Sequence, residues 1–184
     1  MQEISALAKK YDLHVIEDAA QAIGALYEGQ PSGSIGEIGC FSTHPLKNLN
    51  ACGDGGFVTT SDPELAEKIT LMRNHGLTNR NTVERFGIVS RMDVVQAVIL
   101  SYRLSRISGV IENRRHNASI YRAELDTDYV FIPDENEHMF DTYHTFVIQG
   151  ERRDELRSYL MSNGIETAIH YPIPIHLQAA AQFL

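Results

Sequence analysis

The sequence predicts an α/β fold, in which helices alternate with short buried strands. Residues 2–11 carry apolar side chains at helical spacing, and residues 14–18 (HVIED) read as a buried strand directly after them. Similar short strands are expected at residues 38–42 and 57–60, and a helix is expected at residues 61–73. A helix that leads into a Val/Ile strand is half of an α/β unit, so this alternation assigns the class.

Length and charge narrow the function classes. At 184 residues, the chain has room for one domain or slightly more. A formal net charge of −8, without a cluster of lysines or arginines, argues against binding to nucleic acid or to an anionic membrane surface. Small molecules or other proteins are therefore the expected partners.

The cysteines and histidines indicate neither a disulfide nor a metal site. Cys40 and Cys52 match no zinc spacing, and no secretory leader or membrane-length apolar run is present, so a reduced, cytoplasmic setting is expected. None of the eight histidines forms a pair at i, i+4 spacing. We therefore expect no metal ligands.

The remaining elements follow from turn residues and periodicity. Glycines and Pro31 between residues 24 and 39 predict a loop with a small hairpin, and Ser61-Asp-Pro-Glu64 is a helix start. Residues 77–87 have no period and are expected to form a loop. After residue 126 a smaller α+β unit is expected. The predicted later elements are helices at residues 91–107, 110–125 and 152–163, with a break at Ser108-Gly109, strands at residues 129–132, 143–149 and 167–171, and a helix from Leu177.

One lysine is displayed between two strands. Lys47 follows Pro45, which interrupts strand pairing, and precedes the glycine turn of residues 53–56. A lysine amine becomes a Schiff-base nucleophile when its loop lets it reach a carbonyl. The alternative is that Lys47 is an ordinary solvated surface charge.

Asp18 stands where a ligand would bind an open parallel sheet. It ends an apolar strand, and ligands bind outside the carboxyl ends of such strands. The alternative is that Asp18 caps a helix starting at Ala19. Gln21 lies one turn further on, if that segment is helical, and could reach the same ligand.

These side chains together suit a pyridoxal phosphate site. Asp18, Gln21, Ser42 and Lys47 are expected to converge on the carboxyl edge of one sheet. There Asp18 would keep the pyridine nitrogen protonated, Ser42 would donate a hydrogen bond to the phosphate, and Lys47 would carry the cofactor and move the substrate proton.

Several runs of sequence carry a family resemblance. The chain resembles the sugar aminotransferases of the DegT/DnrJ/EryC1/StrS family through VIEDAAQA (Val15–Ala22), GCFSTHPLKNL (Gly39–Leu49), GDGG (Gly53–Gly56), RNHG (Arg73–Gly76), SRMDVVQA (Ser90–Ala97) and YPIPIHLQ (Tyr171–Gln178). By position, the resemblance implies that Lys47 is the Schiff-base lysine, Asp18 the pyridine acid, Gln21 the residue beside the ring and Ser42 the phosphate-contacting serine. Tyr171 and His176 match the motif near the substrate mouth, and His44 is the histidine expected to touch the site.

The resemblance also implies a fold and a reaction. It implies a partial type I aminotransferase fold, with a mostly parallel sheet in a large pyridoxal-phosphate-binding domain (residues 1–109). A connecting helix and part of a small α+β C-terminal domain (residues 110–184) would follow. Family members usually transfer an amino group from glutamate to a nucleotide-linked keto sugar. They do so as homodimers with a shared active site, which residues 77–87 would lie near.

Three comparisons with the family pattern bear on the expected fold and cofactor site. Val89 replaces an asparagine that often precedes the SR dipeptide and reaches the partner subunit's phosphate. The first third and about the last fifth of a typical member are expected to be missing, including the phosphate-cradling loop. Lys47 is not replaced by histidine, which speaks against the dehydratase branch of the family.

Two alternative functions stay open at this point. One is a catalytically incomplete family remnant or interaction module that no longer turns over substrate. The other is a dinucleotide-binding domain that uses Asp18, although the G-x-G-x-x-G turn is absent upstream. The sequence leaves undetermined which sugar, which nucleotide and which ring position would be involved.

Overall fold

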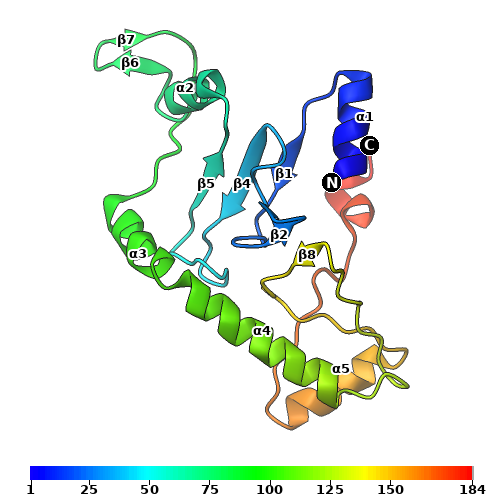
Figure 1. Cartoon of the computed structure of the whole chain (residues 1–184). Helices are drawn as coiled ribbons and strands as arrows, with labels where there is room; N and C mark the ends of the chain where they lie inside the picture. The colour runs from blue at the N-terminus through cyan, green and yellow to red at the C-terminus, as the bar shows by residue number, and fades with distance from the viewer. Residues whose placement is uncertain (184) are drawn as a thin grey trace. The chain divides into compact units, whose positions relative to one another are not determined.

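The computed structural model describes residues 1–183, which divide into two compact units (Figure 1). The first unit contains Met1–Leu125 and Pro133–Phe146, and the second contains Asp126–Ile132 and the chain from Val147 onward. The boundary expected between residues 109 and 110 falls inside a helix of the first unit. The assignment of a cofactor domain and a small domain stays a prediction.

The chain contains both helices and strands, as expected for an α/β chain. The helices are α1 (Gln2–Tyr11), α2 (Pro63–Met72), α3 (Val94–Leu104), α4 (Ile107–Glu124) and α5 (Arg153–Ser162), with 3₁₀ turns η1 (Ile175–Leu177) and η2 (Ala179–Ala181). The strands are β1 (Ile16–Asp18), β2 (Leu26–Tyr27), β3 (Gln30–Pro31), β4 (Ile38–Ser42), β5 (Gly56–Thr59), β6 (Leu77–Asn79), β7 (Thr82–Val83) and β8 (Met139–Phe140).

A three-stranded sheet in the order β1-β4-β5 positions the predicted site. β1 pairs with β4 in parallel, so that Asp18 lies opposite Cys40, and β4 pairs with β5 in antiparallel, so that Ser42 lies opposite Gly56. Both parallel strands therefore end at the same edge of the sheet.

Local signals place several elements correctly. Asp62 caps α2, because its carboxylate accepts the Glu64 and Leu65 amides at 2.8 and 3.3 Å. The small hairpin expected between residues 24 and 39 is β2-β3, and its two turn residues, Glu28 and Gly29, both have positive φ (48° and 78°). Positive φ at both central positions is the type I′ geometry that matches strand twist.

Other predicted elements are wrong. Residues 77–87 contain the hairpin β6-β7 rather than an irregular loop, because cross-strand pairing of Leu77 with Val83 organises a segment that has no local period. The helix break lies at Ser105-Arg106, and α4 runs through Gly109. A glycine in the first turn of a helix costs little, since the amides there lack intrahelical partners in any case.

The second unit is less regular than expected. The strands predicted at residues 129–132 and 143–149 are reduced to one antiparallel bridge between Phe131 and Gln149. No strand forms at residues 167–171, and the helix expected from Leu177 is replaced by the two 3₁₀ turns. Short strands without neighbouring strands to complete a sheet have few partners for their backbone groups.

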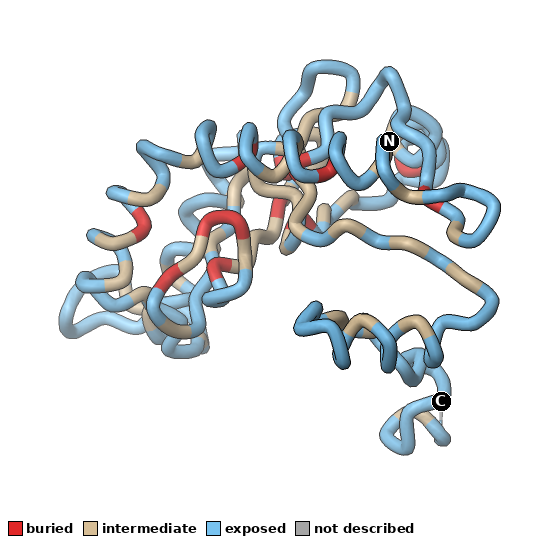
Figure 2. Tube along the Cα trace, turned by 90° about the horizontal axis from the view of Figure 1, so that it is seen from below, coloured by how far each residue is buried: buried red, intermediate tan, exposed pale blue. Residues whose placement is uncertain are grey.

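Few residues are buried, and Figure 2 marks them in red along the Cα trace. One cluster of buried side chains consists of Leu49, Ala51 and Leu100, with Ile23, Phe57, Met92 and Ile107 packed against it. Within residues 1–183 no single helix has the length and apolar composition of a membrane span; α3 and α4 meet those criteria only together, bent by 61°.

Candidate functional site

Asp18 and Ser42 lie on the same face of the sheet. Asp18 pairs with Cys40 in a parallel ladder, and Ser42 lies two residues beyond Cys40, so side-chain alternation directs all three to one side. Along the strand, two residues correspond to about 7 Å. A carboxylate and a hydroxyl therefore stand at neighbouring strand ends on one face.

The opposite face of this sheet is covered by a short loop. Glu17, which points away from Asp18, accepts backbone amides from Gly33 (2.7 Å), Ile35 (2.7 Å) and Gly36 (2.6 Å). The Thr59 hydroxyl donates to the Gly33 carbonyl at 2.6 Å. Glu17 was not among the predicted residues, and a glutamate before a strand-end aspartate carries no sequence signal for this role.

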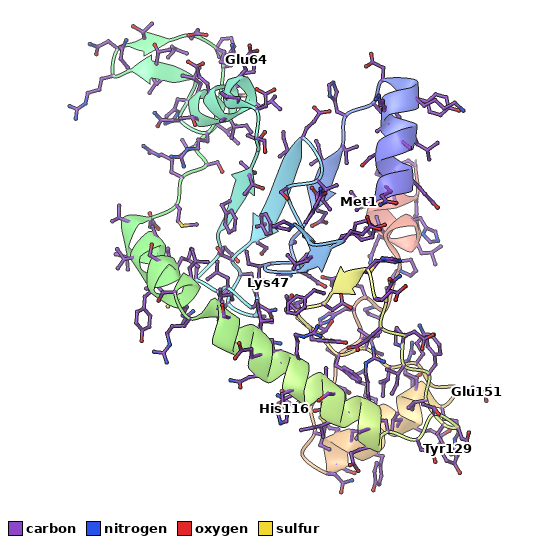
Figure 3. All side chains as sticks on the ribbon, viewed as in Figure 1. Met1, Lys47, Glu64, His116, Tyr129 and Glu151 are labelled. Carbon is purple, nitrogen blue, oxygen red and sulfur yellow. The ribbon has the colours of Figure 1, made fainter. Side chains whose placement is uncertain are left out.

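The lysine loop runs from the end of β4 to the start of β5 and is joined at its base (Figure 3). The Thr43 amide donates to the Gly55 carbonyl at 2.9 Å, and the Thr43 carbonyl accepts the Ala51 amide at 2.8 Å. Thr43 is 0% exposed. At Gly55, an added Cβ would lie 2.7 Å from the Thr43 Oγ1, so glycine is the residue that this close approach permits.

Beyond Lys47 the loop is anchored in the core. Asn48 is buried and donates through Nδ2 to the Thr142 carbonyl at 2.9 Å, and Leu49 belongs to the buried cluster with Leu100. Lys47 is half-buried, whereas the other three lysines of the sequence, Lys9, Lys10 and Lys68, are exposed. The chain therefore holds the backbone on either side of Lys47 more firmly than a solvated surface lysine requires.

His44 lies inside the same loop. Its carbonyl accepts the Lys47 amide at 2.8 Å, and its Nδ1 accepts the Leu46 amide at 3.3 Å. Its Nε2 lies 4.0 Å from the Asp54 carboxylate. The two ring nitrogens thus face different groups, one in the backbone and one in an exposed acid.

The segment after Asp18 is a turn and not a helix. The Asp18 Oδ1 accepts the Ala20 amide at 3.1 Å, and the Ala22 amide bonds to the Ala19 carbonyl at 3.0 Å. The helix-cap alternative for Asp18 is therefore wrong, since the carboxylate caps a turn. Gln21 lies exposed in that turn, just beyond the strand end.

Two predicted residues fall in the second unit. Tyr171 and His176 are both exposed, and His176 lies in η1. Asp18, Ser42 and the Lys47 loop therefore lie at one sheet edge of the first unit. Tyr171 and His176 belong to the second unit. Cys40 and Cys52 are free thiols, and residues 1–183 contain no group of three or more potential metal ligands.

Comparison with known proteins shows what the chain resembles as a whole. A sequence profile described as the DegT/DnrJ/EryC1/StrS aminotransferase family matches residues 1–183. A UDP-N-acetyl-3-dehydro-alpha-D-glucosamine 3-aminotransferase from Acidithiobacillus ferrooxidans is 44% identical over 178 residues, which are 97% of this chain and 48% of that protein. A pleiotropic regulatory protein from Geobacillus stearothermophilus is 42% identical over 181 residues, 97% of this chain and 49% of the relative.

A solved structure agrees with these relatives. The crystal structure of Streptomyces venezuelae DesV in complex with a ketimine intermediate superposes with a TM-score of 0.93 at 40% identity, and the match covers 98% of this chain and 49% of DesV. The expected α/β class and partial aminotransferase fold are confirmed by this likeness. The chain spans about half the length of the curated relatives it matches. By its match over residues 1–183, the chain belongs to the DegT/DnrJ/EryC1/StrS aminotransferase family.

Proposed function

We propose that this chain carries the lysine loop of a pyridoxal-phosphate-dependent aminotransferase that acts on a nucleotide-linked keto sugar. The observation that supports this most directly is the placement of Asp18 and Ser42 on one sheet face, with the Lys47 loop continuing from Ser42. Family membership sets the reaction class to which this geometry is applied.

The residues present fit the part of the cofactor that each would meet. The exposed Asp18 carboxylate suits a protonated pyridine nitrogen, because an ion pair across a hydrogen bond favours the charged ring. The Ser42 Oγ already accepts the His44 amide at 3.3 Å, which leaves its own proton free to be donated to a phosphate oxygen. The half-buried Lys47 supplies the amine.

When bound, pyridoxal phosphate draws electrons from the substrate carbon into its ring. Asp18 would support this by keeping positive charge on the ring nitrogen. Gln21, in the turn after β1, would lie beside the ring. Lys47 would hold the cofactor covalently and then carry the proton that moves at the substrate carbon, which requires an amine held within reach but not buried.

The substrate assignment rests on relatives. The Acidithiobacillus relative is named for an amino transfer on a UDP-linked 3-dehydro sugar, which supports a nucleotide-linked keto sugar as acceptor. Glutamate as amino donor, a homodimeric assembly and a cytoplasmic setting remain parts of the same proposal. His44, Tyr171 and His176 are its substrate-side residues.

The test is to locate the cofactor on the chain. The purified protein is mixed with pyridoxal phosphate, its absorption spectrum is recorded, and the adduct is reduced with borohydride and mapped by peptide mass spectrometry. Because the sequence has only four lysines, the cofactor mass is expected on the Lys47 peptide and not on those of Lys9, Lys10 and Lys68. Lys47→Ala should remove both the band and the labelled peptide.

Lys68→Ala is the matched control, since Lys68 is an exposed lysine of α2, and it should leave both signals unchanged. A reduced adduct spread evenly over the surface lysines would contradict the proposal. A folded chain that forms no adduct at Lys47 would favour the alternative of a catalytically incomplete remnant, which the comparisons do not favour. They give no support to a dinucleotide-binding domain either.

A further inference from the structure

One face of α3 contacts the lysine loop. Most of this helix is exposed, and Val94, Val95 and Val98 are 78%, 70% and 64% accessible. Gln96, Leu100 and Arg103 are instead half-buried or buried, and their i, i+4, i+7 spacing places them on one side of the helix. This side meets the segment that follows Lys47.

Each of these three residues reaches a different point of that segment. The Gln96 Oε1 accepts the Cys52 amide at 2.8 Å, and Leu100 packs with Leu49 and Ala51. Arg103 donates from Nη1 to the Asn50 carbonyl at 2.5 Å and to the Asn50 Oδ1 at 2.9 Å. The segment from Leu49 to Cys52 is therefore anchored along the length of α3.

The Asn50 side chain joins the two limbs of the loop. Its Oδ1 accepts from Arg103, and its Nδ2 donates to the Pro45 carbonyl at 2.7 Å. Pro45 lies two residues before Lys47 and Asn50 three residues after it. The hydrogen bond between them closes a short ring of backbone with Lys47 inside it.

Arg103 sets which way the Asn50 amide faces. An amide can present either its oxygen or its nitrogen to a neighbour, and a guanidinium accepts nothing, so Arg103 selects the oxygen. The amide nitrogen then faces the Pro45 carbonyl, to which it donates. A charged donor in a half-buried position makes this preference stronger than a neutral one would.

We propose that Arg103 is a positioning residue for Lys47, acting through Asn50, whose amide joins the two limbs of the lysine loop. The inference rests on the proposed role of Lys47 as the cofactor-binding amine. It adds that a side chain 56 positions further along the sequence determines where that amine stands. Gln96 holds the far end of the same segment through Cys52.

The first experiment measures the Lys47 amine directly, without cofactor. The protein is labelled briefly with acetic anhydride over a series of pH values, and peptide mass spectrometry gives the rate at each of the four lysines. Lys9, Lys10 and Lys68 are exposed and serve as internal references. The rate gives the accessibility of the Lys47 amine, and its pH profile gives the titration midpoint of that amine.

Two variants remove different hydrogen bonds of the series that joins Arg103, Asn50 and the Pro45 carbonyl. Arg103→Met removes both donations to Asn50, and Asn50→Asp keeps the acceptor for Arg103 but removes the donor to Pro45. Both are expected to raise the Lys47 labelling rate relative to the reference lysines by about three- to tenfold, as the loss of one net hydrogen bond permits. Arg103→Lys, which keeps a charged donor, should lie nearer the wild type.

Arg106→Met is the matched control. Arg106 donates from Nη1 to the Tyr102 hydroxyl at 2.6 Å, on the exposed side of α3, so its loss removes the same charge without touching the loop. The proposal is overturned if the Lys47 rate and titration midpoint in Arg103→Met and Asn50→Asp equal those of Arg106→Met. A general loss of structure in Arg103→Met would show as faster amide exchange throughout the chain. In that case Arg103→Lys and Asn50→Asp are compared, since both keep the shape or charge of the original side chain. Asn50→Asp should still raise the Lys47 rate, and Arg103→Lys should lie nearer the wild type.

A second measurement separates this inference from the proposed function. Pyridoxal phosphate is titrated into each variant, and the absorption band is followed. If wild type forms an adduct on Lys47 and the variants bind the cofactor equally well, the positioning role fails and the proposed function stands. If wild type forms no adduct on Lys47, the proposed function fails, and the inference falls with it whatever the labelling rates show.

Discussion

At the scale of single residues, Glu17 holds the covered face of the sheet. Its carboxylate accepts three backbone amides, one on Oε2 and two on Oε1. A carboxylate can accept at both oxygens, which a carboxamide cannot do. The neighbour Asp18 points to the other face, so adjacent acids have separate roles, one in structure and one in the proposed chemistry.

Glu17→Gln is therefore expected to destabilise the chain although it keeps the shape of the side chain. An amide nitrogen would face a backbone N–H, either that of Gly33 or those of Ile35 and Gly36. We expect the free energy of unfolding to fall by about 1–3 kcal/mol, the cost of leaving a half-buried donor unpaired. Chemical denaturation measures this. Glu67→Gln on the exposed side of α2 is the control, and equal losses in both variants would contradict the assignment.

At the scale of elements, α4 holds a distant segment through its arginines. Arg114 donates from Nη1 to the Tyr143 and His144 carbonyls, each at 3.0 Å, and Arg115 donates to the Asp141 carbonyl at 2.7 Å. Further along, Arg122 donates to the Pro133 carbonyl at 2.6 Å. These bonds explain why Pro133–Phe146 belongs to the first unit although it follows residues of the second.

Arg114→Met should release part of this segment. Two carbonyls lose their donor, so hydrogen–deuterium exchange in residues 141–146 is expected to accelerate by about tenfold, the equivalent of one to two net hydrogen bonds. Exchange in α1 should not change. Arg157→Met, in an exposed position of α5, provides the comparison for loss of charge alone. Unaltered exchange in residues 141–146 would show that the arginine bonds do not hold the segment.

At the scale of the whole molecule, large apolar side chains remain exposed in the first unit. Phe86 is 99% accessible, Val94 78% and Ile16 64%. Ile16 and Val58 stand on the same sheet face as Asp18 and Ser42, since Ile16 lies two residues before Asp18 and Val58 pairs with Cys40. Large apolar side chains exposed to solvent favour association in water.

The chain is accordingly expected to self-associate. Sedimentation velocity at a series of concentrations should show an average mass that rises with concentration. Replacing Val94 and Val98, both exposed on α3, with glutamine should reduce the association, whereas replacing the exposed Thr78 with alanine should not. A monomer that keeps its sedimentation coefficient at all concentrations would contradict this expectation.

The features that depend on neighbouring residues, such as turns, caps and strand bounds, were determined by the sequence alone. The Pro45 and glycine boundaries placed Lys47 in a loop between strands, and the extent of β4 was predicted residue for residue. Asp62 and Pro63 marked the start of α2 because caps act within one turn. The motifs that define the family are likewise local runs, so family and fold class could be inferred before any coordinates.

Strand pairing and hydrogen bonds between separate segments were decided by the tertiary structure alone. The β6-β7 pairing, the hydrogen bonds of Glu17 to residues 33–36 and those of Arg103 to Asn50 join positions 3 to 53 residues apart. Their free energy comes from burial and from hydrogen bonds that form only once the chain has folded, and such contacts have no period or spacing in the sequence. Lys47 itself was visible in the sequence, but the residues that hold its loop in place were not.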